Sequence, residues 1–158
     1  IEKLLVSIKL ISLGEIAIPD EIKDKRRKNI ELSEKEKEEI LNIVNINNIL
    51  TQDSVVLKPY RDVLINYNEK YDGTGFPNKL KGNQIPKLAR TASIVNRFNE
   101  LTFDKSHSLE QALDILEKGK GKDFDPDIAD TLLVSLDKSR EQQKPERTNK
   151  QKRIDRSR

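Results

Sequence analysis

The sequence predicts an all-α fold, a bundle of helices joined by short loops. Apolar residues recur at helical spacing in several segments, and nowhere do apolar and polar residues alternate as in a strand. Two helix-start signals support this interpretation, Ser33 followed by Glu36 and Ser108 followed by Gln111. With 158 residues, the chain is long enough to form one domain with a core of its own.

The helices are predicted from their apolar spacing and from the residues at their ends. The first is expected over residues 1–13, where Gly14 is placed to end it. Pro19 interrupts the next segment, and the charged stretch 23–29 is expected to form a solvated loop. The later predicted helices span residues 33–50, 59–71, 86–103, 109–118 and 125–136.

The composition excludes several classes of protein. The chain has no cysteine, which excludes disulfides, thiolate metal ligands and cysteine nucleophiles. It has no apolar run near 20 residues, so we expect no transmembrane segment and a cytoplasmic protein. The chain begins at Ile1 and contains no methionine, so its natural N-terminus is expected to be missing.

The last twenty residues differ in composition from the rest. Residues 139–158 are rich in Lys and Arg, and Ile154 is their one apolar residue. Such a segment buries too little apolar surface to offset its ordering entropy. We therefore expect one domain over residues 1–138 and a basic, disordered tail. The tail has no aromatic residue for base stacking, so no specific nucleic-acid recognition is expected.

The stretch between Asp72 and Pro86 is dense in turn residues. Gly73 and Gly75 flank Thr74, which permits positive φ and close approach of the backbone. On these residues alone, the segment is either an ordinary connection between helices or a rigid loop that exposes its backbone.

This loop and three further motifs carry a resemblance to a known family. YDGTGFPNKLKGNQIPKLAR resembles the signature of the HD-GYP family, SLEQALDILEKGKGKDFDPDI its closing motif, and LGEIAIPDEI the stretch after its His-Asp dyad. The helix ending in ASIVNRFNELTFDKS also matches in register. The resemblance implies an HD-type helical bundle with C-terminal GYP helices. Active members of that family hydrolyse cyclic di-GMP at a centre of two or three irons held by His, Asp and Glu.

The chain departs from this family at the positions of its metal ligands. Those positions are Ile11, Ser12, Asn42, Tyr67, Asn68 and Asn96. Ile cannot ligate a metal, and neutral Ser, Asn and Tyr are poor replacements for His and carboxylate donors. The family's Lys after the dyad is Glu15 here, which reverses its charge. We therefore expect no metal, no cofactor, no catalytic residue, and a protein that is not an enzyme.

Several functions remain open. An intact signature loop suggests a regulatory or scaffolding module that contacts a protein, such as a GGDEF-type cyclase; the loop residues are Asp72, Gly73, Thr74, Gly75, Phe76 and Pro77. Alternatively, the chain is a cyclic di-GMP phosphodiesterase with a rearranged site, or binds cyclic di-GMP without cleaving it. The candidate phosphate contacts are Lys79, Lys81, Arg90 and Lys105. A further alternative is a structural subunit of a large assembly.

Overall fold

The computed structural model describes residues 2–28, 30–103 and 107–138, and this part of the chain is helical. It contains no β-strand, only an isolated bridge between Lys120 and Phe124. The predicted all-α fold is therefore confirmed. The α-helices are α1 (Glu2–Glu15), α2 (Asp20–Arg27), α3 (Glu34–Gln52), α4 (Arg61–Asn66), α5 (Lys87–Phe103) and α6 (Leu109–Lys118). Two short 3-10 helices, η1 (Lys58–Tyr60) and η2 (Gly82–Gln84), and a last helix over residues 126–138 complete the described part.

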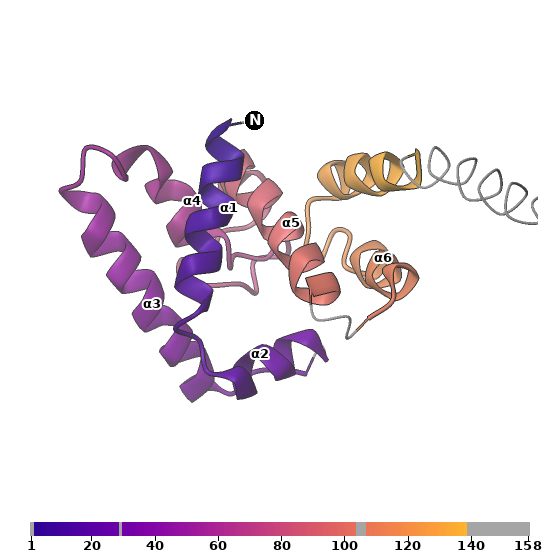
Figure 1. Cartoon of the computed structure of the whole chain (residues 1–158), viewed down its shortest axis with the longest axis horizontal. Helices are drawn as coiled ribbons and strands as arrows, with labels where there is room; N and C mark the ends of the chain where they lie inside the picture. The colour runs from indigo at the N-terminus through magenta and orange to yellow at the C-terminus, as the bar shows by residue number, and fades with distance from the viewer. Residues whose placement is uncertain (1, 29, 104–106, 139–158) are drawn as a thin grey trace, which may run out of the picture.

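The helices are arranged around α1 and α5, which contact each other at the centre of the molecule (Figure 1). α4 contacts both of these helices and also packs on α3, which lies at one side of the view. α6 packs on α5 at the opposite side, and the helix over 126–138 lies near it. α2 lies below α1 in this view, and the loop that joins the two helices directs α2 toward the C-terminal end of α5 (Figure 1).

The core consists of three apolar clusters rather than one. The first joins α1, α4 and α5 through Ile11, Val63, Leu64, Tyr67 and Ala92. The second joins α5, α6 and the last helix through Ile94, Leu116, Phe124 and Ala129. The third joins α2 and α3 through Ile18, Ile22 and Ile40. Each helix is therefore held by its own apolar stripe, as is usual when amphipathic helices pack.

Three predictions of local structure differ from the structure. Residues 23–27 of the charged stretch, which was expected to form a solvated loop, are helical and belong to α2. The first turn of α2 contains Asp20 and Glu21 and its last turn is basic, which suits the helix dipole, and Ile22 is buried on its inner face. Gly14 does not end the first helix, since α1 continues to Glu15. In place of one helix over 59–71, the structure has the 3-10 helix η1 followed by α4, which ends at Asn66.

The predicted helix caps are confirmed. Ser33 and Glu36 form a reciprocal capping box at the start of α3, and Ser108 and Gln111 form another at α6. Asp125 Oδ1 accepts hydrogen bonds from the backbone amides of Asp127 and Ile128 at 3.0 and 3.3 Å. These side chains satisfy amides that have no partner within their own helix.

The tail predicted over residues 139–158 lies outside the described residues, so the proposed boundary after residue 138 stays a prediction. Among the residues that are described, none of the helices combines the length and apolar character needed to cross a membrane.

Ile22 is the one apolar residue of α2, so replacing it tests whether apolar packing holds this helix. The side chain is 2% exposed and packs with Ile18 and Ile40. Replacing Ile22→Ala removes this contact and leaves a cavity, so we expect a loss of about 2–4 kcal/mol in the free energy of unfolding. Urea unfolding followed by circular dichroism measures it. Ile49→Ala, at a side chain that is 68% exposed, is the control and should change stability by less than about 0.5 kcal/mol. Equal losses in the two variants would contradict the packing of α2.

Candidate functional site

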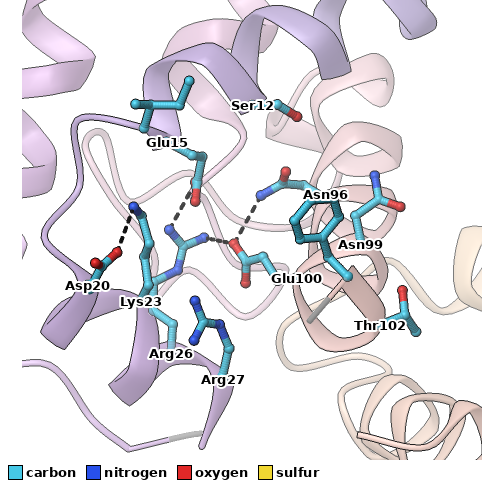
Figure 2. Close-up of a pocket in the computed structure, with 12 residues that line it drawn as sticks. Ser12, Glu15, Asp20, Lys23, Arg26, Arg27, Asn96, Asn99, Glu100 and Thr102 are labelled. Carbon is cyan, nitrogen blue, oxygen red and sulfur yellow. Dashed lines mark hydrogen bonds and ion pairs between the residues drawn. The ribbon is translucent and has the colours of Figure 1, made fainter. Parts of the chain in front are cut away.

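A pocket of about 650 Å³ opens between α1, α2 and the C-terminal half of α5 (Figure 2). Two of its lining residues, Ser12 and Asn96, are positions that match metal ligands in the family resemblance. Lys23, Arg26 and Arg27 of α2 line the same pocket. The fold therefore brings parts of the expected site together and places basic side chains beside them.

At the position of the family's His-Asp dyad, this chain has Ile11 and Ser12 in place of metal-binding side chains. Ile11 is 1% exposed and belongs to the first core cluster, where it packs together with Tyr67. The hydroxyl of Ser12 donates to the carbonyl of Ile8 at 2.9 Å, within the same helix. Neither side chain carries the imidazole or carboxylate donor that such a metal centre uses.

The other positions matched to ligands are dispersed. Tyr67 is buried, and its hydroxyl donates to Oε1 of Glu15 at 3.3 Å. Asn96 is also buried, and its amide donates to Oε1 of Glu100 at 3.1 Å. Asn68 is half-buried and Asn42 is exposed on α3, and neither lines the pocket. Of the six ligand-matched positions, Ser12 and Asn96 line the pocket, and Tyr67 reaches its lining residue Glu15 from the core. The remaining positions do not line it; they are Ile11, Asn42 and Asn68.

A network of buried charges occupies the floor of the pocket. Arg26 lies between two carboxylates, with Nη1 donating to Oε1 of Glu15 at 2.9 Å and Nη2 donating to Oε1 of Glu100 at 2.5 Å (Figure 2). Arg97 donates to the second oxygen of Glu100 at 3.1 Å. Tyr67 joins the network through Glu15. The network therefore connects α1, α2 and α5 with the residue that follows α4.

The burial of this network changes the pKa of its members. Burial alone would lower the pKa of Arg26, but the carboxylates of Glu100 and Glu15 outweigh it and raise that pKa above its ordinary value. Burial also raises the pKa of Tyr67, and the charge of Glu15 adds to the effect, so the phenol stays protonated and able to donate. Burial raises the pKa of Glu100, while Arg26 and Arg97 act in the opposite direction.

The donor set does not fit the metal centre that the resemblance implies. Within the described ranges, no group of three or more His, Cys, Asp and Glu is placed to hold a metal ion. Three carboxylates line the pocket, and each is paired: Glu15 and Glu100 share the guanidinium of Arg26, and Asp20 pairs with Lys23. His107, the one histidine of the chain, does not line this pocket.

The signature loop is held by contacts inside the molecule. Asp72 Oδ1 accepts hydrogen bonds from the backbone amide and the hydroxyl of Thr74 at 2.8 and 2.6 Å. Gly73 has a φ of +87°, and a Cβ on Gly75 would lie 2.1 Å from the backbone nitrogen of Lys70. No residue with a side chain fits at Gly75 without moving the backbone, which explains that glycine physically.

Glu69 and Phe76 attach this loop to the rest of the fold. Glu69 is 3% exposed, and its carboxylate accepts the backbone amides of Asn78 at 2.6 Å and Leu80 at 3.1 Å. Burial raises the pKa of Glu69, although these backbone hydrogen bonds oppose the change. Phe76 packs against the third core cluster, and the peptide bond between it and Pro77 is cis. Glu69 is therefore a structural acceptor for the loop.

The four candidate phosphate contacts are not gathered at the pocket. Lys79, Lys81 and Arg90 do not line it, and Lys105 lies outside the described residues. Arg90 instead forms an ion pair with Asp125 and donates to Oδ1 of Asn83 at 2.8 Å. It therefore joins the start of α5 to the start of the last helix.

Arg26 and Glu100 are functional residues of the pocket that the sequence did not predict. Arg26 belongs to the stretch expected to be a loop, and its two partners lie 11 and 74 positions away. No local pattern reports contacts at such separations. The local signals for Glu100 were its spacings from Asn96 (i, i+4) and Arg97 (i, i+3) on α5.

The family of the chain follows from its comparison with known proteins. A model of the HD domain family matches residues 2–128. The chain belongs to the HD domain family. Together with relatives named cyclic di-GMP phosphodiesterases, this match confirms the predicted HD-GYP-like identity and agrees with the all-helical bundle.

Three curated relatives illustrate the similarity. The chain is 32% identical over 78 residues (47% of the chain) to a probable cyclic di-GMP phosphodiesterase of Vibrio cholerae. It is 29% identical over 136 residues (81% of the chain) to the 3'3'-cGAMP-specific phosphodiesterase 2 of the same organism. It is 24% identical over 131 residues (78% of the chain) to a cyclic di-GMP phosphodiesterase of Thermotoga maritima. The aligned part spans 18%, 25% and 34% of these relatives, respectively.

These relatives contradict the expectation that the chain is not an enzyme. Each is named a phosphodiesterase, and their names point to an enzyme although the identity is low. The expectation was drawn from side chains lost at single positions, such as Ile11 and Asn96. Such losses show which metal donors are missing there, but they do not show what the protein binds or converts.

Glu69 provides a test of how the signature loop is held. In Glu69→Gln, one oxygen is replaced by an NH₂ group, which cannot accept from the amide of Asn78 or Leu80. One buried backbone donor is then left unpaired, so we expect a loss of about 1–3 kcal/mol in the free energy of unfolding, measured by urea titration. Glu38→Gln, at an exposed position of α3, controls for the loss of charge. A Glu69→Gln variant as stable as this control would show that the carboxylate does not hold the loop.

Proposed function

We propose that this chain is the HD domain of a protein that binds and turns over a cyclic dinucleotide, and that the dinucleotide binds in the pocket between α1, α2 and α5. The observation that carries the proposal is the convergence of Ser12 and Asn96 on a pocket lined by Lys23, Arg26 and Arg27. The first two match ligand positions of the family. Lys23 and Arg27, which do not belong to the buried network of Arg26, suit the negative phosphodiester groups of such a ligand.

The rim of the pocket supports the same class of ligand. Phe103, at the end of α5, lines the pocket and is 92% exposed. An exposed aromatic ring beside basic side chains suits a nucleotide, because the base stacks on the ring while the phosphate meets the cations. The names of the relatives, which include cyclic di-GMP and 3'3'-cGAMP, support a cyclic dinucleotide in particular.

Turnover of the ligand is part of the proposal for the whole protein, since the chain spans only part of its relatives. No catalytic step is assigned to a metal, because the described donors do not fit the centre implied by the resemblance. The alternative that the signature loop docks on a protein partner stays a prediction. The contacts of Asp72, Gly75 and Phe76 described above lie within the chain itself.

Binding is tested by titration calorimetry of the whole chain with cyclic di-GMP and with 3'3'-cGAMP. We expect heat of binding with at least one of them. Lys23→Gln and Arg27→Gln, which each remove one positive charge from the pocket, should weaken binding by about three- to tenfold. Lys118→Gln is the control, because Lys118 pairs with Asp114 on the surface of α6 and should leave the affinity unchanged. Absence of heat with both ligands, or equal losses in the control, would contradict the pocket as the binding site.

Turnover is tested separately by chromatography of the nucleotides after incubation with the chain, with and without added Mn²⁺ or Fe²⁺. We expect a linear dinucleotide or mononucleotides as products of phosphodiester hydrolysis. Binding without any product under either condition would contradict the turnover part of the proposal and leave the binding part in place.

A further inference from the structure

Of the three carboxylates that line the pocket, two are protected from solvent and need a cation close to them. Glu15 and Glu100 come from different helices, and their side chains are 14% and 15% exposed. Ionised carboxylates in such a protected place repel each other and lose hydration, unless a positive group stands between them. In the family that the chain resembles, metal ions supply positive charge at this part of the fold.

Arg26 supplies that charge here. Its side chain is 18% exposed, and its two terminal nitrogens donate to one carboxylate each, at 2.9 Å to Glu15 and 2.5 Å to Glu100. A guanidinium has donors in a planar fork and keeps its charge at any working pH. It therefore connects two acceptors that approach from different sides, which one ammonium group does less well.

The surrounding groups make the charges of the network balance. Arg97 pairs with the second oxygen of Glu100 at 3.1 Å, so two guanidinium groups face two carboxylates. The neutral hydroxyl of Tyr67 and the neutral amide of Asn96 complete the hydrogen bonds. No negative charge of this network is left over to attract a divalent cation.

We propose that Arg26 is a permanent cation built into the pocket, which takes over the charge-neutralising role of a divalent metal and makes the folded pocket independent of metal. Arg26 is in this sense a positioning residue, since it fixes α2 against the ends of α1 and α5. The proposal rests on contacts within the chain and stands whether or not a cyclic dinucleotide binds. The two proposals therefore fail separately.

The test is thermal unfolding of the whole chain, followed by circular dichroism. Arg26→Met keeps much of the side-chain volume but removes the charge, and leaves Glu15 and Glu100 buried without their cation. We expect its Tm to fall by about 10 °C. Arg27→Met is the matched control, from the same helix and the same pocket, and its Tm should fall by less than about 3 °C. Equal losses in the two variants would overturn the proposal.

A double variant separates the charge of Arg26 from its packing. In Glu15→Gln/Arg26→Met the carboxylate of Glu15 is neutralised along with Arg26, and Glu100 keeps its ion pair with Arg97. Replacing a buried ion pair as a whole costs far less than removing one partner. We therefore expect the double variant to recover at least half of the Tm lost in Arg26→Met. A double variant that is no more stable than Arg26→Met would overturn the role of charge.

The unmodified chain provides a test that does not depend on any variant folding. We expect the same Tm in EDTA, in Mn²⁺ and in Fe²⁺, since a ligand that does not bind the folded state does not stabilise it. A Tm that falls in EDTA would overturn the proposal.

Arg26→Lys keeps the charge but lacks the planar fork of donors. Its Tm should lie between that of Arg26→Met and that of the unmodified chain. A Tm at or below that of Arg26→Met would count against the role of Arg26 as the cation.

Discussion

The contact of Arg26 with Glu15 and Glu100 is the interaction on which the arrangement of the pocket depends. It joins the last turn of a highly charged helix, α2, to the ends of α1 and α5. Ile22 buries the apolar side of α2, but the ion network determines which of its polar residues faces inward. Breaking one partner of such a buried network leaves an uncompensated charge, which is far more costly than losing an exposed ion pair. The position of α2, and with it one wall of the pocket, follows from this requirement.

The glycine-rich loop obeys a second constraint, which is packing. Gly75 approaches the backbone of Lys70 so closely that a Cβ has no room, and Glu69 holds the following turn through two backbone amides. The backbone amide of Asp72 donates to the carbonyl of Lys122 at 2.9 Å, which ties the loop to the turn before the last helix. The motif that carries the family resemblance therefore also connects the segment after α4 to the turn before the last helix. This structural role explains its presence whether or not it takes part in a reaction.

The positions that match metal ligands have taken on different tasks. Ile11 and Tyr67 pack together in the first core cluster, and Asn96 became a hydrogen-bond donor to Glu100. These changes agree with one another, because neutral and apolar side chains replace charged donors where an internal guanidinium provides the positive charge. The chain nevertheless belongs to the HD domain family, and the relatives it matches are named cyclic dinucleotide phosphodiesterases. Loss of single donors was therefore insufficient evidence that the protein is not an enzyme.

The sequence by itself determined the helical class, most helix positions, the capping boxes at Ser33 and Ser108, and the turn-rich loop with its family resemblance. These features depend on residues within a few positions of one another, as with Ser33 and Glu36. Only the tertiary structure decided that residues 23–27 of the charged stretch form part of a helix, that Asn42 does not line the pocket, and that Arg26 meets Glu100. The reason is that burial and ion pairing depend on partners brought together by folding, here 74 residues apart, and no local spacing contains that information.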